Sequence, residues 1–338
     1  MTPDPNSGPV LLLGASGTIG QATLAALSAA GYETLCLVRA SPAARRLAQT
    51  LPAGAKLREI DLTAGPDAFH TALAGLRIPA VISCLASRSG LPEEAWQIDH
   101  QATSHAVSAA QDAGASRAVL LSALCVQRPQ LAFQRAKLAM EAELIASGMT
   151  YSIVRPTAFF KSLSGQVARV QEGKPYLLFG NGELTACKPI GDADLAQFLV
   201  GCLSMPDREN RILPIGGPGP AVTPRDLGRW LFDRLGRPAR FRHVPVGLIS
   251  GIARGLSALG RISPRLRAKA ELARIAHYYA TEPMLVFDPA TGCHDAAATP
   301  SFGTETIFEH YERLISGDRS ADLGAHRVFA RASATPPR

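Results

Sequence analysis

The stretch VLLLGASGTIG, from Val10 to Gly20, decides the fold of this chain. Its four apolar residues follow one another without polar alternation, which is typical of a strand buried on both faces of a parallel sheet. Glycines then fall three apart, at Gly14, Gly17 and Gly20, just before the helical pattern QATLAALSAAG. Such a turn brings backbone N–H groups and the positive end of a helix to a phosphate, and the missing side chains let the phosphate approach. The stretch therefore predicts a dinucleotide-binding turn.

The glycine spacing, GxxGxxG, differs from the common GxGxxG fingerprint. By itself it is also compatible with a strand-to-helix turn that binds nothing. A buried strand before it, a helix after it and a second strand about twenty residues further on favour the nucleotide-binding interpretation. The cofactor contacts predicted in this turn are Gly14, Ser16, Gly17, Thr18, Ile19 and Gly20.

Length and composition indicate a globular protein of 338 residues, 46% hydrophobic and 19% charged. The six cysteines form no CxxC pair and no regular spacing, so we expect reduced thiols and neither a disulfide framework nor a metal site. Residues 1–9, MTPDPNSGP, have no basic or apolar leader pattern, and no apolar run reaches the length of a membrane span. We therefore expect a disordered N-terminus on a cytoplasmic protein.

The net charge of +7 is concentrated in one segment. Residues 234–274 contain ten Lys or Arg residues and one acidic residue, Glu271, while the rest of the chain is slightly acidic. Because the basicity is local and no recognisable module accompanies it, nucleic-acid binding is not predicted. A solvated face, a site for a substrate carboxylate and peripheral contact with a membrane surface all stay open for this segment.

A second strand, ETLCLVR, ends at Arg39. An acidic residue at this position would accept hydrogen bonds from a ribose hydroxyl, whereas an arginine complements the additional phosphate of NADP. The alternative is an ordinary surface arginine, since Arg45 and Arg46 follow closely. We interpret Arg39 as a contact that favours NADPH.

Further apolar runs alternate with helical patterns, which predicts parallel strands joined by right-handed crossovers. The fold class is therefore α/β, a Rossmann-type doubly wound sheet with a smaller carboxyl-terminal part that faces the substrate. Cofactors bind beyond the carboxyl ends of such strands. The residues predicted there are Asp61, Leu62, Cys84, Leu85, Ala86, Ser122, Pro156 and Thr157, with a small buried hydrophobe as the alternative interpretation of Cys84.

The chain resembles the atypical branch of the short-chain dehydrogenase/reductase superfamily, which also holds NmrA-like and isoflavone-reductase-like proteins. The resemblance spans about residues 10–217 and rests on GASGTIG, the Asp61-Leu62 pair, DHQATSHAVSAAQDAGASRAVLLSA, and IVRPTAFF followed by PIGDADLAQFLV. It implies an NADP-binding domain over residues 10–160. Residues 161–317 would complete the sheet and form the substrate-binding part, and residues 318–338 would be a disordered tail.

One position departs from that superfamily, which usually carries a tyrosine four residues before a lysine. Here the segment is FQRAK, with Phe133 before Lys137. Phenylalanine cannot protonate the alkoxide left by ketone reduction. Two outcomes therefore stay open: hydride transfer to a conjugated carbon–carbon double bond, or cofactor sensing without chemistry. Under the resemblance Lys137 is the catalytic residue, which binds the nicotinamide ribose and keeps positive charge near a developing carbanion.

A closer resemblance follows from the segments AHYYATEPMLVFDPATG, TPSFGTETIFEHYERLISG and CVQRPQLAFQRAKLAMEAEL. Over about residues 10–317 the chain is similar to the NADPH-dependent divinyl chlorophyllide 8-vinyl reductases of chlorophyll and bacteriochlorophyll synthesis. The resemblance implies reduction of the 8-vinyl group of divinyl chlorophyllide or protochlorophyllide to ethyl, at the periphery of the photosynthetic membrane.

The proton for that reaction would come from water or Lys137, since no tyrosine stands at the superfamily position. The macrocycle would lie against aromatic side chains, with core packing as the alternative for one of the two phenylalanines of the Phe159-Phe160 pair. The side chains predicted for this wall are Phe133, Phe159, Phe160, Tyr278 and Tyr279. A non-enzymatic NADP-sensing regulator and a reductase of another conjugated alkene remain the alternative functions.

Overall fold

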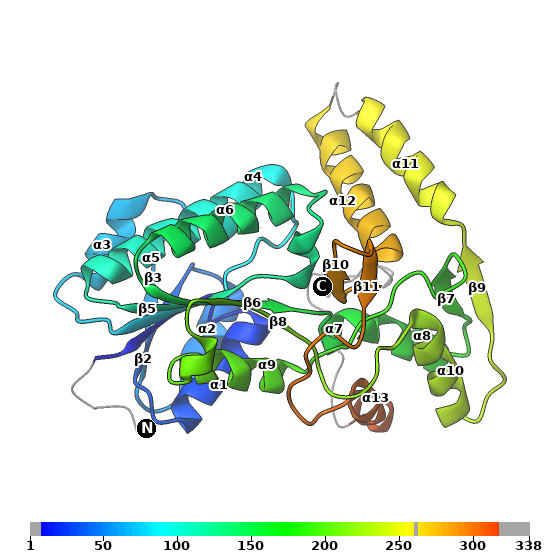
Figure 1. Cartoon of the computed structure of the whole chain (residues 1–338), viewed down its shortest axis with the longest axis horizontal. Helices are drawn as coiled ribbons and strands as arrows, with labels where there is room; N and C mark the ends of the chain where they lie inside the picture. Colours follow the sequence, from blue (N-terminus) through cyan, green and yellow to red (C-terminus); the bar gives the residue numbers. More distant parts are fainter. Residues whose placement is uncertain (1–7, 260–262, 318–338) are drawn as a thin grey trace, which may run out of the picture.

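The computed structural model describes residues 8–259 and 263–317. Residues 1–7 of the predicted disordered N-terminus, 1–9, and the whole predicted tail, 318–338, lie outside the described residues. Its centre is a seven-stranded sheet of order β3-β2-β1-β4-β5-β6-β8, in which all neighbours pair parallel (Figure 1). The strands are β1 (Val10–Leu13), β2 (Thr34–Val38), β3 (Ala55–Glu59), β4 (Ala80–Ser83), β5 (Arg117–Leu121), β6 (Thr150–Pro156) and β8 (Arg211–Ile215). The predicted doubly wound fold is confirmed. The strand order reverses between β1 and β4, the position where such sheets bind their ligands.

Both faces of the sheet are buried, as the unbroken apolar run of β1 predicts. Leu11 and Leu13 belong to one core, whereas Val10 and Leu12 belong to the other. Helices α3 (Pro66–Leu73), α5 (Thr103–Asp112) and α6 (Ala132–Ala146) cover the first face. Helices α1 (Thr18–Ala29), α2 (Pro42–Gln49) and α9 (Asp192–Gly201) cover the second.

The helical segment before α5 is not regular. It begins as α4 (Pro92–Ala95), continues as a π-helical stretch, η1 (Trp96–Ala102), and only then becomes α5. The hydrophobic periodicity alone predicts one continuous helix. Single π-helical turns inside α-helices occur frequently at functional sites, and this one carries the buried carboxylate of Asp99.

A smaller part is built mainly from residues after 160 and has its own core. A two-stranded parallel sheet, β7 (Tyr176–Phe179) and β9 (Phe241–Val244), packs with the helices of this part. These helices are α7 (Phe160–Leu163), α8 (Val167–Gln171), α10 (Pro224–Arg234) and α13 (Ile307–Ser316), and the short turn η3 (Ser164–Gln166) joins α7 to α8. Two further short turns, η2 (Leu124–Gln127) and η4 (Pro206–Arg208), lie outside this part. Since β8 lies in the main sheet, the second half of the chain contributes to both parts.

Helices α11 (Val246–Leu259) and α12 (Pro264–Thr281) pack along each other and project from the body of the molecule (Figure 1). The chain then forms a short antiparallel pair, β10 (Val286–Asp288) and β11 (Cys293–Asp295). Within residues 8–259 and 263–317, no helix is both long and apolar enough to cross a membrane. All six cysteines are free thiols.

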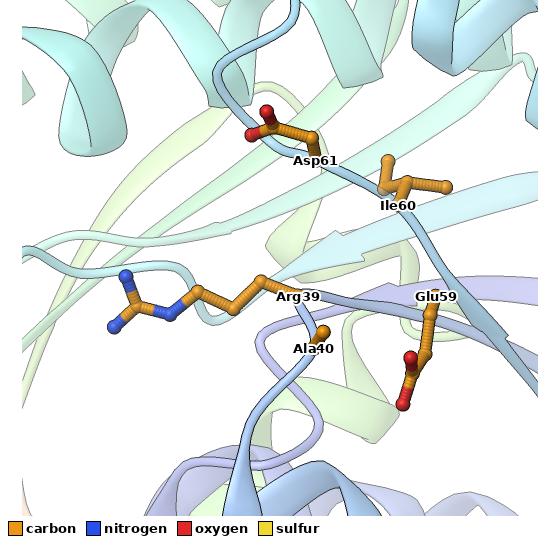
Figure 2. A pocket seen from close by; sticks show the side chains of 5 residues that line it. All are labelled: Arg39, Ala40, Glu59, Ile60 and Asp61. Atoms are coloured by element: carbon orange, nitrogen blue, oxygen red, sulfur yellow. The ribbon is translucent and has the colours of Figure 1, made fainter.

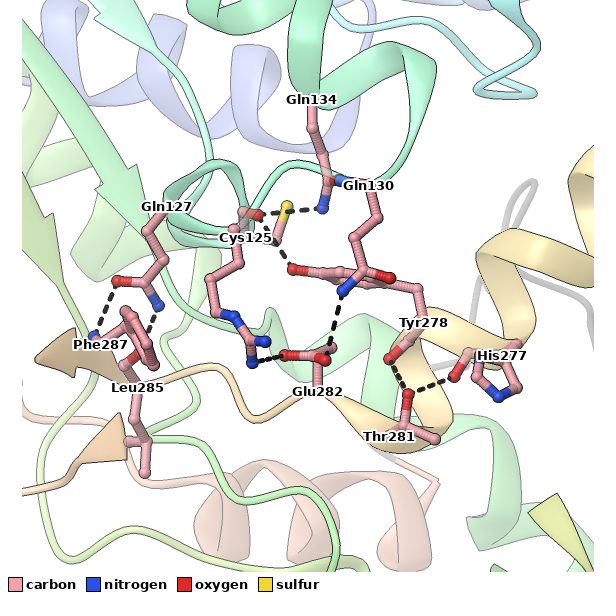
Figure 3. Close-up of polar contacts among 11 residues, drawn as sticks. Cys125, Gln127, Gln130, Gln134, His277, Tyr278, Thr281, Glu282, Leu285 and Phe287 are labelled. Atoms are coloured by element: carbon pink, nitrogen blue, oxygen red, sulfur yellow. Dashed lines mark hydrogen bonds and ion pairs between the residues drawn. The ribbon is translucent and has the colours of Figure 1, made fainter. Parts of the chain in front are cut away.

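Polar contacts attach the end of α12 to the segment between β5 and α6 (Figure 3). The Tyr278 hydroxyl and the Gln134 side-chain amide both donate to the backbone carbonyl of Cys125, each at 3.0 Å. The Arg128 guanidinium lies 2.9 Å from the Glu282 carboxylate. These contacts fix α12 beside the first turn of α6, the helix that carries Lys137.

Candidate functional site

The glycine turn leaves no room for side chains on its inner side. A Cβ at Gly14, where φ is +77°, would lie 2.7 Å from the Cys84 carbonyl oxygen, and one at Gly20 would lie 2.1 Å from the Gly14 carbonyl oxygen. Gly17 is exposed, and no side chain caps the first N–H groups of α1 there. Free helix N–H groups beside a turn without side chains fit a dinucleotide phosphate.

The other predicted residues of this turn contribute in different ways. Ser16 is half-buried, and Thr18 is exposed with its hydroxyl 3.0 Å from the Lys161 ammonium. The side chain of Ile19 belongs to the core between the sheet and α1. Only its backbone is therefore available to a ligand, a distinction that the motif does not reveal.

Arg39 lies in a cleft beyond the ends of β2 and β3, as Figure 2 shows. The cleft has a volume of about 390 Å³ and is lined by Arg39, Ala40, Glu59, Ile60 and Asp61. Hydrogen bonds from the Thr63 hydroxyl and backbone N–H hold the pKa of Asp61 below its usual value. Arg39 thus supplies the positive charge among the residues that line this cleft, together with the acidic side chains of Glu59 and Asp61. The predicted Leu62 does not line the cleft and is buried in the core.

Three predicted residues follow the end of β4, beside the glycine turn. Cys84 follows β4, and burial raises the pKa of its thiol to about 12, against the smaller lowering effects of the Thr23 hydroxyl and of Lys137. Ala86 is exposed two residues later, while Leu85 is buried. The thiol therefore stays protonated, which is the behaviour of the small buried hydrophobe that the sequence allowed.

The remaining strand-end hydroxyls are engaged by the protein itself. The Ser122 hydroxyl donates to the buried carboxylate of Glu141. The Thr157 hydroxyl donates to the Lys188 carbonyl, and Pro156 pairs with Ile215 in the sheet. These three residues shape the edge of the sheet, and the hydroxyls of the first two are committed to protein acceptors.

Lys137 forms a buried ion pair. Its ammonium lies 3.0 Å from Oδ1 of Asp99, whose side chain is 1% exposed. The second carboxylate oxygen accepts a hydrogen bond from the Ser87 backbone N–H at 3.2 Å. Burial raises the pKa values of the Cys84 and Cys125 thiols, and the positive charge of Lys137 lowers both by a smaller amount. Lys137 is therefore held by a carboxylate between the ends of β4 and β5.

Asp99 and Cys125 are site residues that the sequence analysis missed. Asp99 shares a face of its helix with Ala102 and Ala106, which are buried. An acidic residue on an otherwise apolar helix face could have predicted an ion pair, because a buried carboxylate needs a partner. Cys125 had no such signal, because its contacts with α12 join segments that are distant in the sequence.

The predicted aromatic residues do not form one wall. Phe133 and Ile275 pack against the same small cluster around Cys125. Tyr278 is buried in that cluster, whereas Tyr279 is 48% exposed. Phe159 is half-buried against the core that α1, α2 and α9 cover. Phe160 is enclosed in the core of the smaller part, where its ring centroid lies 5.2 Å from that of His310.

This distribution separates four of the five residues by role. Phe133 and Tyr279 have surfaces available next to the Lys137 site, while core packing is the role that the structure supports for Phe160 and Tyr278. The alternative interpretation, that one of the two adjacent phenylalanines packs in a core, therefore fits Phe160.

Comparison with known proteins agrees with this geometry. Residues 14–206 match the family model described as NAD(P)H-binding, which places the chain in that family. The chain is 42% identical over 338 residues to the chloroplastic divinyl chlorophyllide a 8-vinyl-reductase of Cucumis sativus, an alignment that covers 96% of this chain and 81% of that protein. The chain belongs to the divinyl chlorophyllide a 8-vinyl-reductase family.

The chloroplastic reductase of the same name from Oryza sativa subsp. indica is also 42% identical over 338 residues, covering 96% of this chain and 83% of that protein. Among solved structures, an NADPH-dependent quinone oxidoreductase from Escherichia coli, in complex with NADPH, superposes with a TM-score of 0.64 at 18% identity. That superposition covers 90% of this chain and 99% of the other, and it supports the fold. The family predicted from the sequence and the NAD(P)H class of cofactor are confirmed.

Proposed function

We propose that this protein reduces the 8-vinyl group of divinyl chlorophyllide a to ethyl, with NADPH as the reductant. The observation that carries the proposal is the buried Asp99–Lys137 pair, formed by the helices that follow β4 and β5, beside a phenylalanine where ketone reductases of this superfamily carry a tyrosine. The names of the relatives at 42% identity support the substrate. Divinyl protochlorophyllide is the second substrate to test.

When bound, NADPH supplies the hydride, and the chain provides the electrostatic environment. The glycine turn and the first N–H groups of α1 would hold the pyrophosphate, and Arg39 would meet the additional phosphate of the adenosine ribose. Lys137, fixed by Asp99, would bind the nicotinamide ribose and place a positive charge where electron density accumulates on the substrate. Adding a hydride to the terminal vinyl carbon leaves that density delocalised over the conjugated ring system.

Incubation of the purified protein with NADPH and divinyl chlorophyllide a tests this function. The 8-ethyl pigment should appear in step with NADPH oxidation, as resolved by chromatography and absorption spectra. An unchanged pigment, with NADPH bound but not oxidised, would favour the NADP-sensing alternative. An unchanged pigment with reduction of another conjugated alkene would favour the third interpretation.

We also propose that the α11–α12 hairpin contacts an anionic membrane surface, where a hydrophobic pigment would be met. Leu248 and Ile252 lie one turn apart on α11 and are 55% and 50% exposed. Arg254 is exposed on the same helix, and Arg267 and Lys269 are exposed on α12. Exposed apolar side chains accompanied by cations are typical of helices that lie in a membrane interface.

A further inference from the structure

The end of α12 places a phenol at the Lys137 site. Tyr279 follows Tyr278, whose hydroxyl donates to the Cys125 carbonyl, and the Tyr279 phenol and the Cys125 thiol each shift the pKa of the other, so the two groups are neighbours. Cys125 lies within the electrostatic reach of Lys137, and Asp99 lies within that of Tyr279. The two tyrosines meet edge to face with ring centroids 5.7 Å apart.

The packing of α12 gives the same result. A Cβ at Gly90 would lie 3.0 Å from Cδ1 of Ile275 and 3.6 Å from Cδ1 of Phe133. The Ile275 and Phe133 side chains therefore both pack beside Gly90. Tyr279 follows Ile275 by four residues, one turn, and therefore lies on the face of α12 that packs toward Phe133 and Cys125.

Packing alone does not account for Tyr279. Tyr278 is 3% exposed and joins the apolar cluster, whereas Tyr279 keeps 48% of its surface exposed although Cys125 and Asp99, on the inner side, both raise the pKa of its phenol. Its ring thus borders the space in front of the Lys137 site. Burial of the hydroxyl, together with the neighbouring Cys125, raises the pKa of Tyr279 well above its usual value, which keeps the phenol protonated.

We infer that Tyr279 is the proton donor of the reduction and replaces, from α12, the tyrosine that is missing at position 133. The inference rests on the proposed function and replaces the sequence-based expectation that water or Lys137 supplies the proton. Lys137 then acts as the cation that stabilises the negative charge created at the site.

A hydride from NADPH forms a C–H bond at the terminal vinyl carbon, and the π electron pair moves to the inner carbon and the conjugated ring. The O–H bond of Tyr279 breaks as its proton bonds to the inner carbon, which leaves the ethyl group and a phenolate. Water reprotonates the phenolate through the exposed side of the ring, so the net change is one hydride and one proton added to the vinyl group.

The test compares Tyr279→Phe with Tyr151→Phe, the same change at a half-buried tyrosine near the amino end of β6. Single-turnover reduction of divinyl chlorophyllide a is followed in H₂O and D₂O, together with KM, kcat and the Kd for NADPH. Loss of a positioned acid lowers a rate by about 10²–10⁴-fold. We expect Tyr279→Phe to lose about 10²-fold in kcat, with the Kd for NADPH unchanged and the solvent isotope effect of the wild type altered.

Each other result contradicts the inference. If Tyr279→Phe raises KM and leaves kcat and the isotope effect unchanged, the residue is only part of the pigment-binding wall. If it equals the wild type and Tyr151→Phe throughout, it has no role in the reaction. If the wild-type protein binds NADPH but does not reduce the vinyl group, the proposed function itself fails and the inference fails with it.

Discussion

Nζ of Lys137 and Oδ1 of Asp99 lie 3.0 Å apart in a pair from which water is largely excluded. The two residues come from different helices, and the carboxylate belongs to the π-helical stretch η1. A buried pair of this kind stabilises a fold weakly compared with apolar packing, but removing one partner leaves an uncompensated charge. The pair therefore indicates a functional role for the lysine. Replacing one partner or both distinguishes that role from a contribution to stability.

Lys137→Ala should lower kcat by about 10²-fold or more, since it removes the charge that stabilises the reacting substrate. It should also lower the free energy of unfolding by about 3–5 kcal/mol, because Asp99 is left buried and unpaired. The double variant Lys137→Met with Asp99→Leu should recover most of that stability and none of the activity. Equal recovery of both in denaturant unfolding and turnover assays would assign the pair a structural role only.

Gly17→Ala and Gly20→Ala should separate cofactor binding from folding. A Cβ at Gly17 meets only the Gly14 carbonyl oxygen, at 3.3 Å, and otherwise extends into the space left for the phosphate. We expect weaker NADPH binding with an almost unchanged Tm. A Cβ at Gly20 clashes with backbone at 2.1 Å, so that variant should lower Tm. Fluorescence titration with NADPH and thermal unfolding measure the two effects, and the reverse pattern would contradict the placement of the phosphate.

Arg39→Ala should weaken NADPH binding without affecting NADH. A charge-assisted hydrogen bond contributes about 1.5–3 kcal/mol, which corresponds to a rise in Kd of about 10- to 150-fold. Lys56→Ala, at an exposed position near the start of β3, is the matched control and should bind both cofactors like the wild type. An equal loss of affinity for NADPH and NADH in Arg39→Ala would show that this arginine does not read the additional phosphate.

Leu248→Gln with Ile252→Gln should reduce co-sedimentation with vesicles that contain anionic lipid, because the exposed apolar face of α11 would no longer enter the interface. Ile145→Gln changes a side chain that is 44% exposed at the end of α6 and should leave sedimentation unchanged. Binding of the wild type should weaken as salt is added. Equal sedimentation with neutral vesicles, or no effect of the double variant, would remove the hairpin from membrane contact.

The sheet and the cofactor turn could be predicted from the sequence because local patterns determine them. The apolar run Val10–Leu13 and the glycines after it specify a buried strand and a turn whatever the rest of the chain does. Arg39 was placed correctly at a strand end for the same reason. The division of the chain near residue 160 stays a prediction.

The lysine site could be predicted only in part because contacts between distant segments complete it. Asp99 reaches Lys137 through an irregular helix that periodicity does not reveal. Tyr279 comes to Cys125 because the end of α12 is attached by Tyr278 and Glu282 to the segment before α6. The absence of a tyrosine at position 133 therefore led to the expectation of a site without a phenol, whereas our inference assigns that role to Tyr279, 146 residues further along the sequence.

The most direct measurement uses NADPH carrying deuterium at the transferable position of the nicotinamide, with the purified protein and divinyl chlorophyllide a in a single turnover. Mass spectrometry and NMR of the pigment should show one deuterium in the methyl group of the new 8-ethyl substituent, with the inner carbon protonated from solvent-exchangeable hydrogen. A pigment recovered with its vinyl group intact, or an ethyl group without deuterium, would contradict direct reduction by the bound cofactor.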